Sequence, residues 1–410
     1  MLGALMRYCL KVVRIILITL ILISTAFTGD IVRFNPAQAA AKNDLFSIIT
    51  WELTKLPEKW SHKINMYFKS NTNPQSQRTD NIYRYFSENN NKSNEVSKQD
   101  IEISIEELIS DVIKREGLTY FGTIVFPPLS ITLDSAPNVL ITSPRDKIQR
   151  GDEALLKPDL LVSEMADIEN ELFIEENLSS LVIPVGGIAT YPVIIDETGD
   201  LLWALQTAAH EWMHTFLFFK PLGFNMFESP EMQTLNETVA SLAGKEIGLL
   251  TINLLMENYP SKNKFCKFLN PPASVSKNEF DFSREMKTTR IQADKLLSEG
   301  RIEEAERYME NRRMVFNSNG YPIRKLNQAY FAFYGTYAES PASTSIIGEQ
   351  VRKYRSNFEG VGNFIKKISQ IGTYDEFVKS LEDIDNKIEN QYSRVKNTHS
   401  TSTVIPFICE

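Results

Sequence analysis

Residues 207–216 read TAAHEWMHTF and hold two of the chain's four histidines, spaced four apart, with a glutamate directly after the first. On an α-helix, residues i and i+4 lie one turn apart on one face, so His210 and His214 can reach a single metal ion. Glu211 lies beside them and can act as a general base on a water at that ion. It is the only charged residue of the stretch, as is typical of a buried helix whose polar face is a site. The pattern predicts a zinc site with a catalytic glutamate; a pair of satisfied core histidines is the alternative.

A third metal ligand is expected, because a catalytic zinc usually takes three protein ligands and leaves one position for water. The remaining histidines, His62 and His399, fall in the N-terminal segment and in the polar C-terminal tail, so a carboxylate is the better candidate. Lys220 stands six residues after the second histidine, where the metzincin pattern has its third histidine. That pattern is therefore excluded.

With this motif the sequence resembles the gluzincins, a superfamily of zinc metallopeptidases. Its thermolysin-like and aminopeptidase members take the third ligand from a glutamate on the following helix, often preceded by asparagine. The corresponding segment here reads LNETVASLAG. The resemblance implies Glu237 as the third ligand, in preference to Glu228 or Glu231.

Small residues follow this glutamate, and they would let its helix approach the histidine helix closely: Ala240, Ser241 and Gly244. Helix packing alone also accounts for them. The interval from His214 to Glu237 is a few residues longer than in thermolysin, and Ser241 replaces the aspartate that usually lies one turn after the third ligand. Which residues orient the histidines therefore stays open.

A second resemblance covers about residues 200–380 and rests on RIEEAERYMENRRMVF and IRKLNQAYFAFYGTYAESPAS. These segments resemble bacterial proteins predicted to be zinc aminopeptidases, although the GxMxN signature that binds the substrate amine is missing. Asn327, Tyr330, Tyr334 and Tyr337 fall at i, i+3, i+7 and i+10, which predicts one stripe of a helix. The hydroxyls of Tyr334 and Tyr337 are candidate donors to an oxyanion, and an aromatic core stripe is the alternative.

Periodicity predicts the elements that position these residues. Residues 122–144 alternate in short runs like hairpin strands, and Pro192 favours an edge strand for the run 188–196. Helices are expected at about 102–116, 158–177, 200–219 with an Asp200 cap, and from Ser229 and Pro230 onward. Beyond residue 260 the chain reads as helical, with a helical hairpin turning at Gly300.

This order predicts an α+β fold with a zincin-like catalytic body, in which a small antiparallel or mixed sheet accompanies the active-site helices. A mostly helical C-terminal region follows. Residues 70–100 are rich in Asn and Ser and poor in aliphatic residues, which is typical of a linker. The expected regions are a signal peptide or membrane anchor (1–39), an N-terminal helical segment with a disordered polar linker (40–100), a catalytic domain (101–260) and a helical subdomain (261–410).

The start of the chain is typical of an export signal: Arg7, Lys11 and Arg14 precede the uncharged run 15–29, which is short for a bilayer span. Cleavage is expected after Ala39 or, earlier, near Ala26. An uncleaved run would tether the body to the membrane, facing outward. Either route predicts an extracytoplasmic protein, whether periplasmic, secreted or membrane-anchored. Cys266 and Cys409 then either pair or stay free thiols.

Charge and motif together predict the function. The net charge of −8 argues against nucleic acid as a partner. We expect an exported zinc-dependent peptidase that acts on peptides or proteins, with endo- or aminopeptidase action and the oligomeric state left open. The alternative is a non-catalytic, membrane-tethered binding or scaffold protein with a zincin fold, but a structural zinc site does not require Glu211. An intramembrane protease does not fit, because the chain has only one long apolar run.

Overall fold

The computed structural model describes residues 34–69, 75–87, 97–257 and 280–394. The predicted export signal up to residue 33, His399 and both Cys266 and Cys409 lie outside the described residues. The helices are α2 (Pro36–Ala40), α3 (Ile48–Lys69), α4 (Gln75–Ser87), α5 (Lys98–Arg115), α6 (Val162–Glu175), α7 (Leu201–Phe218), α8 (Pro221–Phe224), α9 (Pro230–Glu257), α11 (Phe282–Ser298), α12 (Ile302–Ser318), α13 (Gln328–Tyr334), α14 (Ile347–Arg355), α15 (Val361–Ile368) and α16 (Tyr374–Arg394). The strands are β1 (Ile131–Leu133), β2 (Asn138–Pro144), β3 (Glu153–Leu156), β4 (Leu178–Pro184), β5 (Gly187–Ile188) and β6 (Val193–Ile195).

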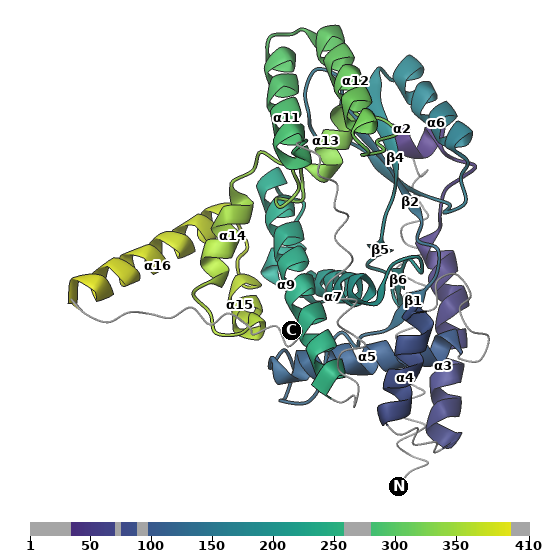
Figure 1. Cartoon of the computed structure of the whole chain (residues 1–410), viewed down its shortest axis with the longest axis vertical. Coiled ribbons are helices and arrows are strands. Elements are labelled where there is room, and N and C mark those ends of the chain that lie inside the picture. The colour runs from purple at the N-terminus through teal and green to yellow at the C-terminus, as the bar shows by residue number, and fades with distance from the viewer. Residues whose placement is uncertain (1–33, 70–74, 88–96, 258–279, 395–410) are drawn as a thin grey trace.

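The described strands form two small sheets, and the α+β class predicted from the sequence is confirmed. One sheet has the order β3-β2-β4 and is antiparallel throughout. The other has the order β1-β6-β5, in which β6 pairs parallel with β1 and antiparallel with β5. The first sheet lies with α2, α6 and the α11–α12 hairpin in the upper part of Figure 1, and the second lies beside α7 below it.

Strand β6 is the central strand of its sheet, so the edge position predicted from Pro192 is wrong. The proline immediately precedes Val193, the first residue of the strand. A proline there removes no hydrogen bond from the ladder. The two edges of this sheet are instead β1 and the short strand β5.

Helix α4 lies within the stretch that was predicted to be a disordered linker, and for residues 75–87 that prediction is wrong. Ile82 is fully buried and Tyr85 nearly so, in the same hydrophobic core as Ile101 and Ile105 of α5. The polar composition of the neighbouring residues concealed this short apolar face.

The main hydrophobic core is built around α7 and α9, with side chains from α5, β1, β6 and the C-terminal helices packed onto them. Gly244 of α9 allows the close approach. A Cβ at this position would lie 2.8 Å from the carbonyl oxygen of Gln206 and 2.9 Å from Cβ of His210. The predicted small-residue face therefore does bring the two helices together at the histidines.

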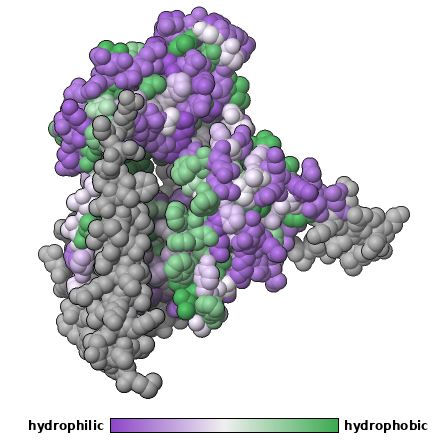
Figure 2. Space-filling view, turned by 180° about the vertical axis from the view of Figure 1, so that it is seen from behind, coloured by the Kyte–Doolittle hydropathy of each residue, from purple (hydrophilic) through white to green (hydrophobic). Residues whose placement is uncertain are grey.

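Among the described residues, one helix, α9, has the length and apolar composition that would allow it to cross a membrane. Its most apolar window is 61% buried inside the molecule, as in a core helix. On the face opposite to that of Figure 1, hydrophobic residues gather in a band near the middle, while hydrophilic residues cover most of the upper part (Figure 2). Hydrophobic residues on this face are thus most concentrated in the band, with others dispersed above and beside it.

Candidate metal centre

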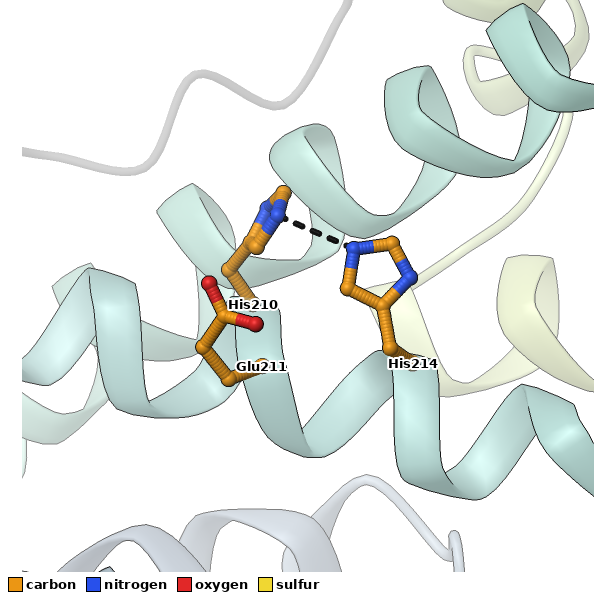
Figure 3. A group of neighbouring side chains, drawn as sticks. All are labelled: His210, Glu211 and His214. Carbon is orange, nitrogen blue, oxygen red and sulfur yellow. Dashed lines mark hydrogen bonds between the residues drawn. The ribbon is translucent and has the colours of Figure 1, made fainter. Parts of the chain in front are cut away.

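Helix α7 presents the histidines because its capping and burial pattern follow the local sequence. The Asp200 side chain accepts a hydrogen bond of 2.8 Å from the Trp203 backbone, which starts the helix where predicted. Trp212 and Met213 on one face are buried in the core. Figure 3 shows His210, Glu211 and His214 on the other face, with the two imidazole rings adjacent. Their ligand atoms all lie within 4.8 Å of one another.

Glu237 of α9 adds a carboxylate to this pair. The two histidine Nε2 atoms are 3.1 Å apart. Oε2 of Glu237 lies 3.7 Å from Nε2 of His210 and 3.5 Å from Nε2 of His214. Ligands bound at 2.0–2.2 Å to a tetrahedral zinc ion are about 3.4 Å apart. The three atoms therefore have the spacing of three ligands around one ion.

Oε2 of Glu237 is also buried and has no hydrogen-bond partner. An unpaired buried carboxylate oxygen costs several kcal/mol, unless a metal or a charge compensates it. Two imidazole nitrogens and this oxygen form a donor set that suits zinc. The residues present thus fit a metal ion.

Each histidine has a further partner that orients its ring. Nδ1 of His214 lies 3.0 Å from Oδ1 of Asn236. The amide nitrogen of Asn236 donates to the Leu222 carbonyl at 3.4 Å, which leaves Oδ1 to accept from His214. His210 hydrogen-bonds to the backbone of Ala240. These contacts leave both Nε2 atoms for a metal and answer the question of orientation that the sequence left open.

The charges of the metal-free site are strongly coupled. Burial alone would lower the pKa of His214, but the Glu237 carboxylate raises it to about 9. Burial would raise the pKa of Glu237, whereas the charge of His214 lowers it to about 2. Burial, with the neighbouring charge of His214, lowers the pKa of His210 to about 4. In the metal-free chain, one proton on His214 therefore balances Glu237.

Glu211 lies against the edge strand β5, close to Gly187. It hydrogen-bonds to the backbone of Ala189, and burial raises its pKa to about 7. A Cβ on Gly187 would lie 3.1 Å from Cγ of Glu211 and 2.8 Å from Cγ2 of Thr207. The glycine therefore lets β5 pass close to this carboxylate.

A cavity of about 1020 Å³ opens over these residues. Its remaining lining includes residues 186–189 around β5, an apolar wall with Phe126 and Phe219, and a group on the side of the β3-β2-β4 sheet. This last group contains Arg150, Phe333 and Tyr337. The site is thus enclosed by segments far apart in the sequence.

Arg150 of this group was not predicted from the sequence, because nothing in the local pattern distinguishes it from other surface arginines. Its guanidinium forms a two-pronged ion pair with Glu153 and lies 5.5 Å from the centre of the Phe333 ring. Burial alone would lower the pKa of Arg150, but the Glu153 carboxylate raises it above the ordinary value, with smaller contributions from Tyr337 and Glu237. Arg150 is therefore a fixed positive charge across the cavity from the ligands.

The two predicted tyrosines are separated by the end of a helix. Helix α13 ends at Tyr334, with Gly335 as its C-cap and Asn327 as its N-cap, so the prediction of one helical stripe through Tyr337 is wrong. Tyr334 packs on Tyr330 with ring centres 4.5 Å apart and does not line the cavity. Tyr337 lines it, and burial together with Glu237 and Glu211 raises its pKa well above the ordinary value.

The structure also separates the three candidate glutamates. Glu228 and Glu231 are exposed, whereas Glu237 is buried beside the histidines. Comparison of the chain with protein-family models, with curated proteins and with solved structures finds no match. Fold and site define the class: an α+β protein with an HExxH-type group that could bind a metal ion.

Proposed function

We propose that this protein is a zinc-dependent peptidase that hydrolyses peptide bonds in peptides or proteins outside the cytoplasm. The observation that carries the proposal is the convergence of His210, His214 and Glu237 at ligand spacing, with Glu211 beside them in an open cavity. The two histidines and Glu237 would hold the ion. When bound, zinc supplies a Lewis acid that lowers the pKa of a water and polarises a carbonyl.

Glu211 acts as the general base and not as a ligand in this proposal. Its carboxylate accepts the proton of the attacking water and later delivers that proton to the leaving amine. Burial raises the pKa of Glu211 to about 7 in the metal-free chain. The charge of a bound ion would lower this pKa again, which keeps the carboxylate ionised and able to accept that proton at neutral pH. A purely structural metal site would not need a buried carboxylate at this position.

The substrate backbone would lie along β5. This strand is at the edge of its sheet, and residues 186–189 line the cavity next to Glu211. An extended peptide can pair with such an edge by β-augmentation, which places its carbonyl groups over the histidines. The edge strand expected in the run 188–196 is thus supplied by β5 in place of β6.

Tyr337 is the proposed donor to the developing oxyanion. It lines the cavity from the side of the β3-β2-β4 sheet, and burial raises its pKa, which keeps its hydroxyl protonated at neutral pH. A hydroxyl donor in a partly dehydrated cavity stabilises a tetrahedral oxyanion more than the planar carbonyl of the substrate. Tyr334, which lies outside the cavity lining, has no such position.

The test uses the full chain, because α3 and α4 contribute buried residues to the body. Metal content and hydrolysis of a mixed peptide library are measured for the wild type, Glu211→Gln and the exposed control Glu231→Gln. We expect one zinc per chain in all three, and hydrolysis reduced at least about a hundredfold in Glu211→Gln alone. Zinc binding without hydrolysis by the wild type would instead favour the binding or scaffold alternative.

A further inference from the structure

Large apolar side chains are exposed on three segments near the opening of the cavity. Phe121 is 95% exposed, and Phe224 and Phe227 are each 79% exposed. The first two segments touch through the rings of Phe126 and Phe219, whose centres are 5.2 Å apart, and the third begins at the end of α8, which packs on α7. We call this the aromatic surface; it consists of Phe121, Ile124, Phe218, Phe219, Phe224 and Phe227.

Substrate binding in the cavity does not account for this surface. Phe218 and Phe219 line the cavity, but Phe121, Phe224 and Phe227 do not. Stabilisation of the fold does not account for them either, because their side chains remain mostly in solvent. Contiguous exposed apolar residues mark an interaction site.

Phe121 is at a backbone position that disfavours it. Phe121 and Gly122 have φ of 50° and 78°, in a tight turn closed by pairing between Tyr120 and Ile124. Consecutive positive φ values favour Asn, Asp or Gly. A phenylalanine at this position lowers the stability of the fold and leaves its ring in solvent at the tip of the turn. We therefore infer that the ring contacts a partner outside the molecule.

The charge of these segments distinguishes possible partners. The chain has 52 acidic residues and a net charge of −8, yet residues 117–133 contain no charged residue and residues 212–227 contain no acidic one. Lys220 lies in this region, with Nζ 5.3 Å from the centre of the Tyr120 ring. Glu228, directly after Phe227, is the exposed carboxylate that borders these segments. Exposed aromatic rings beside a lysine, on segments that are themselves free of acidic residues, are suited to a bilayer interface with anionic headgroups.

The N-terminal sequence brings the body near such a surface. The apolar run 15–29 follows three basic residues, and the body starts at Pro36 of α2, at most about 25 Å of extended chain beyond Gly29. Ala37 of α2 is fully buried, so cleavage after Ala39 would remove a packed helix. A chain that keeps the run holds the aromatic surface at high effective concentration beside the bilayer.

We propose that the aromatic surface docks on an anionic lipid bilayer, with the cavity opening beside the membrane. Phe121, Phe224 and Phe227 insert at the level of the headgroups, and Lys220 pairs with lipid phosphates. Docking does not depend on the metal or on hydrolysis, so it can hold or fail independently of the proposed peptidase activity.

The test places a tryptophan on the aromatic surface of the full chain. Phe121→Trp and Phe224→Trp are compared with Ile174→Trp, a control on α6 whose native side chain is 73% exposed. Each variant is reconstituted in phosphatidylcholine–phosphatidylglycerol vesicles with and without brominated acyl chains, which quench tryptophan at short range. We expect the added tryptophan at 121 or 224 to be quenched at least about twofold more than that at 174, as for residues inserted at the interface.

A second set of variants removes the surface without touching the cavity. In Phe121→Ser/Phe224→Ser/Phe227→Ser, amides of residues 117–128 and 216–228 should lose the protection from hydrogen exchange that vesicles confer on the wild type. Ile174→Ser should keep that protection. Equal quenching at 121, 224 and 174, or exchange in these segments that vesicles do not change, would overturn the lipid assignment and point to a protein partner for this surface.

Discussion

Replacing Gly244 by alanine tests how closely α9 must approach α7 to form the metal site. The added Cβ would lie 2.8 Å from the Gln206 carbonyl oxygen and 3.0 Å from Cα of His210. Ordinary contact begins near about 3.5 Å, so the helices would have to separate by roughly 0.7 Å. No side-chain rotation relieves the contact, because two of the atoms met belong to the backbone.

Two consequences are expected from this separation. Overpacking costs about 1–3 kcal/mol, and improved helix propensity offsets about 1 kcal/mol of this, so the free energy of unfolding should fall by up to about 2 kcal/mol. Glu237 lies on the same helix, and a displacement of this size exceeds the ±0.2 Å within which ligand distances must fall. Zinc affinity should therefore drop at least about tenfold.

The assay combines urea unfolding of the metal-free chain with zinc titration against a competing chelator. Gly248→Ala is the matched control, since a Cβ there also meets the Gln206 backbone, at 3.0 Å, but lies one turn farther from Glu237. It should destabilise the chain comparably and weaken zinc binding less. Unchanged unfolding and unchanged zinc affinity in Gly244→Ala would refute the argument that helix spacing sets the ligand geometry.

Three further predictions concern the site itself. Glu237→Gln should lose most bound zinc, while Glu231→Gln keeps it; equal metal contents by atomic absorption would remove Glu237 from the ligand set. Tyr337→Phe should keep zinc and KM but lower kcat by about 10²–10³, the cost of one oxyanion donor, and an unchanged kcat would exclude that role. The metal-free chain should lose stability as pH rises from about 6.5 to about 9, because folding raises the pKa of His214 to about 9 and the favourable protonated pair with Glu237 is lost as that proton leaves. Urea unfolding across this range checks the sign, and rising stability would contradict it.

Local sequence signals were sufficient to predict the helices that carry the HExxH motif and Glu237. The caps at Asp200 and Ser229, the pair at i and i+4 and the turn at Gly300 depend on neighbouring residues only, and the structure has each of them. Longer-range expectations fared less well. The edge strand at Pro192 and the helical stripe through Tyr337 failed because strand order and helix ends depend on contacts that single segments do not encode. The proposed division into domains and the export of the chain stay predictions.

The sequence by itself determined that His210, Glu211 and His214 share one helical face, since a period of 3.6 residues places them there in any fold that keeps the helix. The segment LNETVASLAG had already proposed Glu237 through its resemblance to a known family. Only the tertiary structure placed that carboxylate beside the two imidazoles, brought Asn236 and the backbone of Ala240 to the rings, and put Arg150 in the lining of the same cavity. These groups are brought to the site by the packing of α7 on α9 and of the antiparallel sheet across the cavity. Such packing depends on shape complementarity between segments far apart in the chain, and no local pattern of residues specifies it.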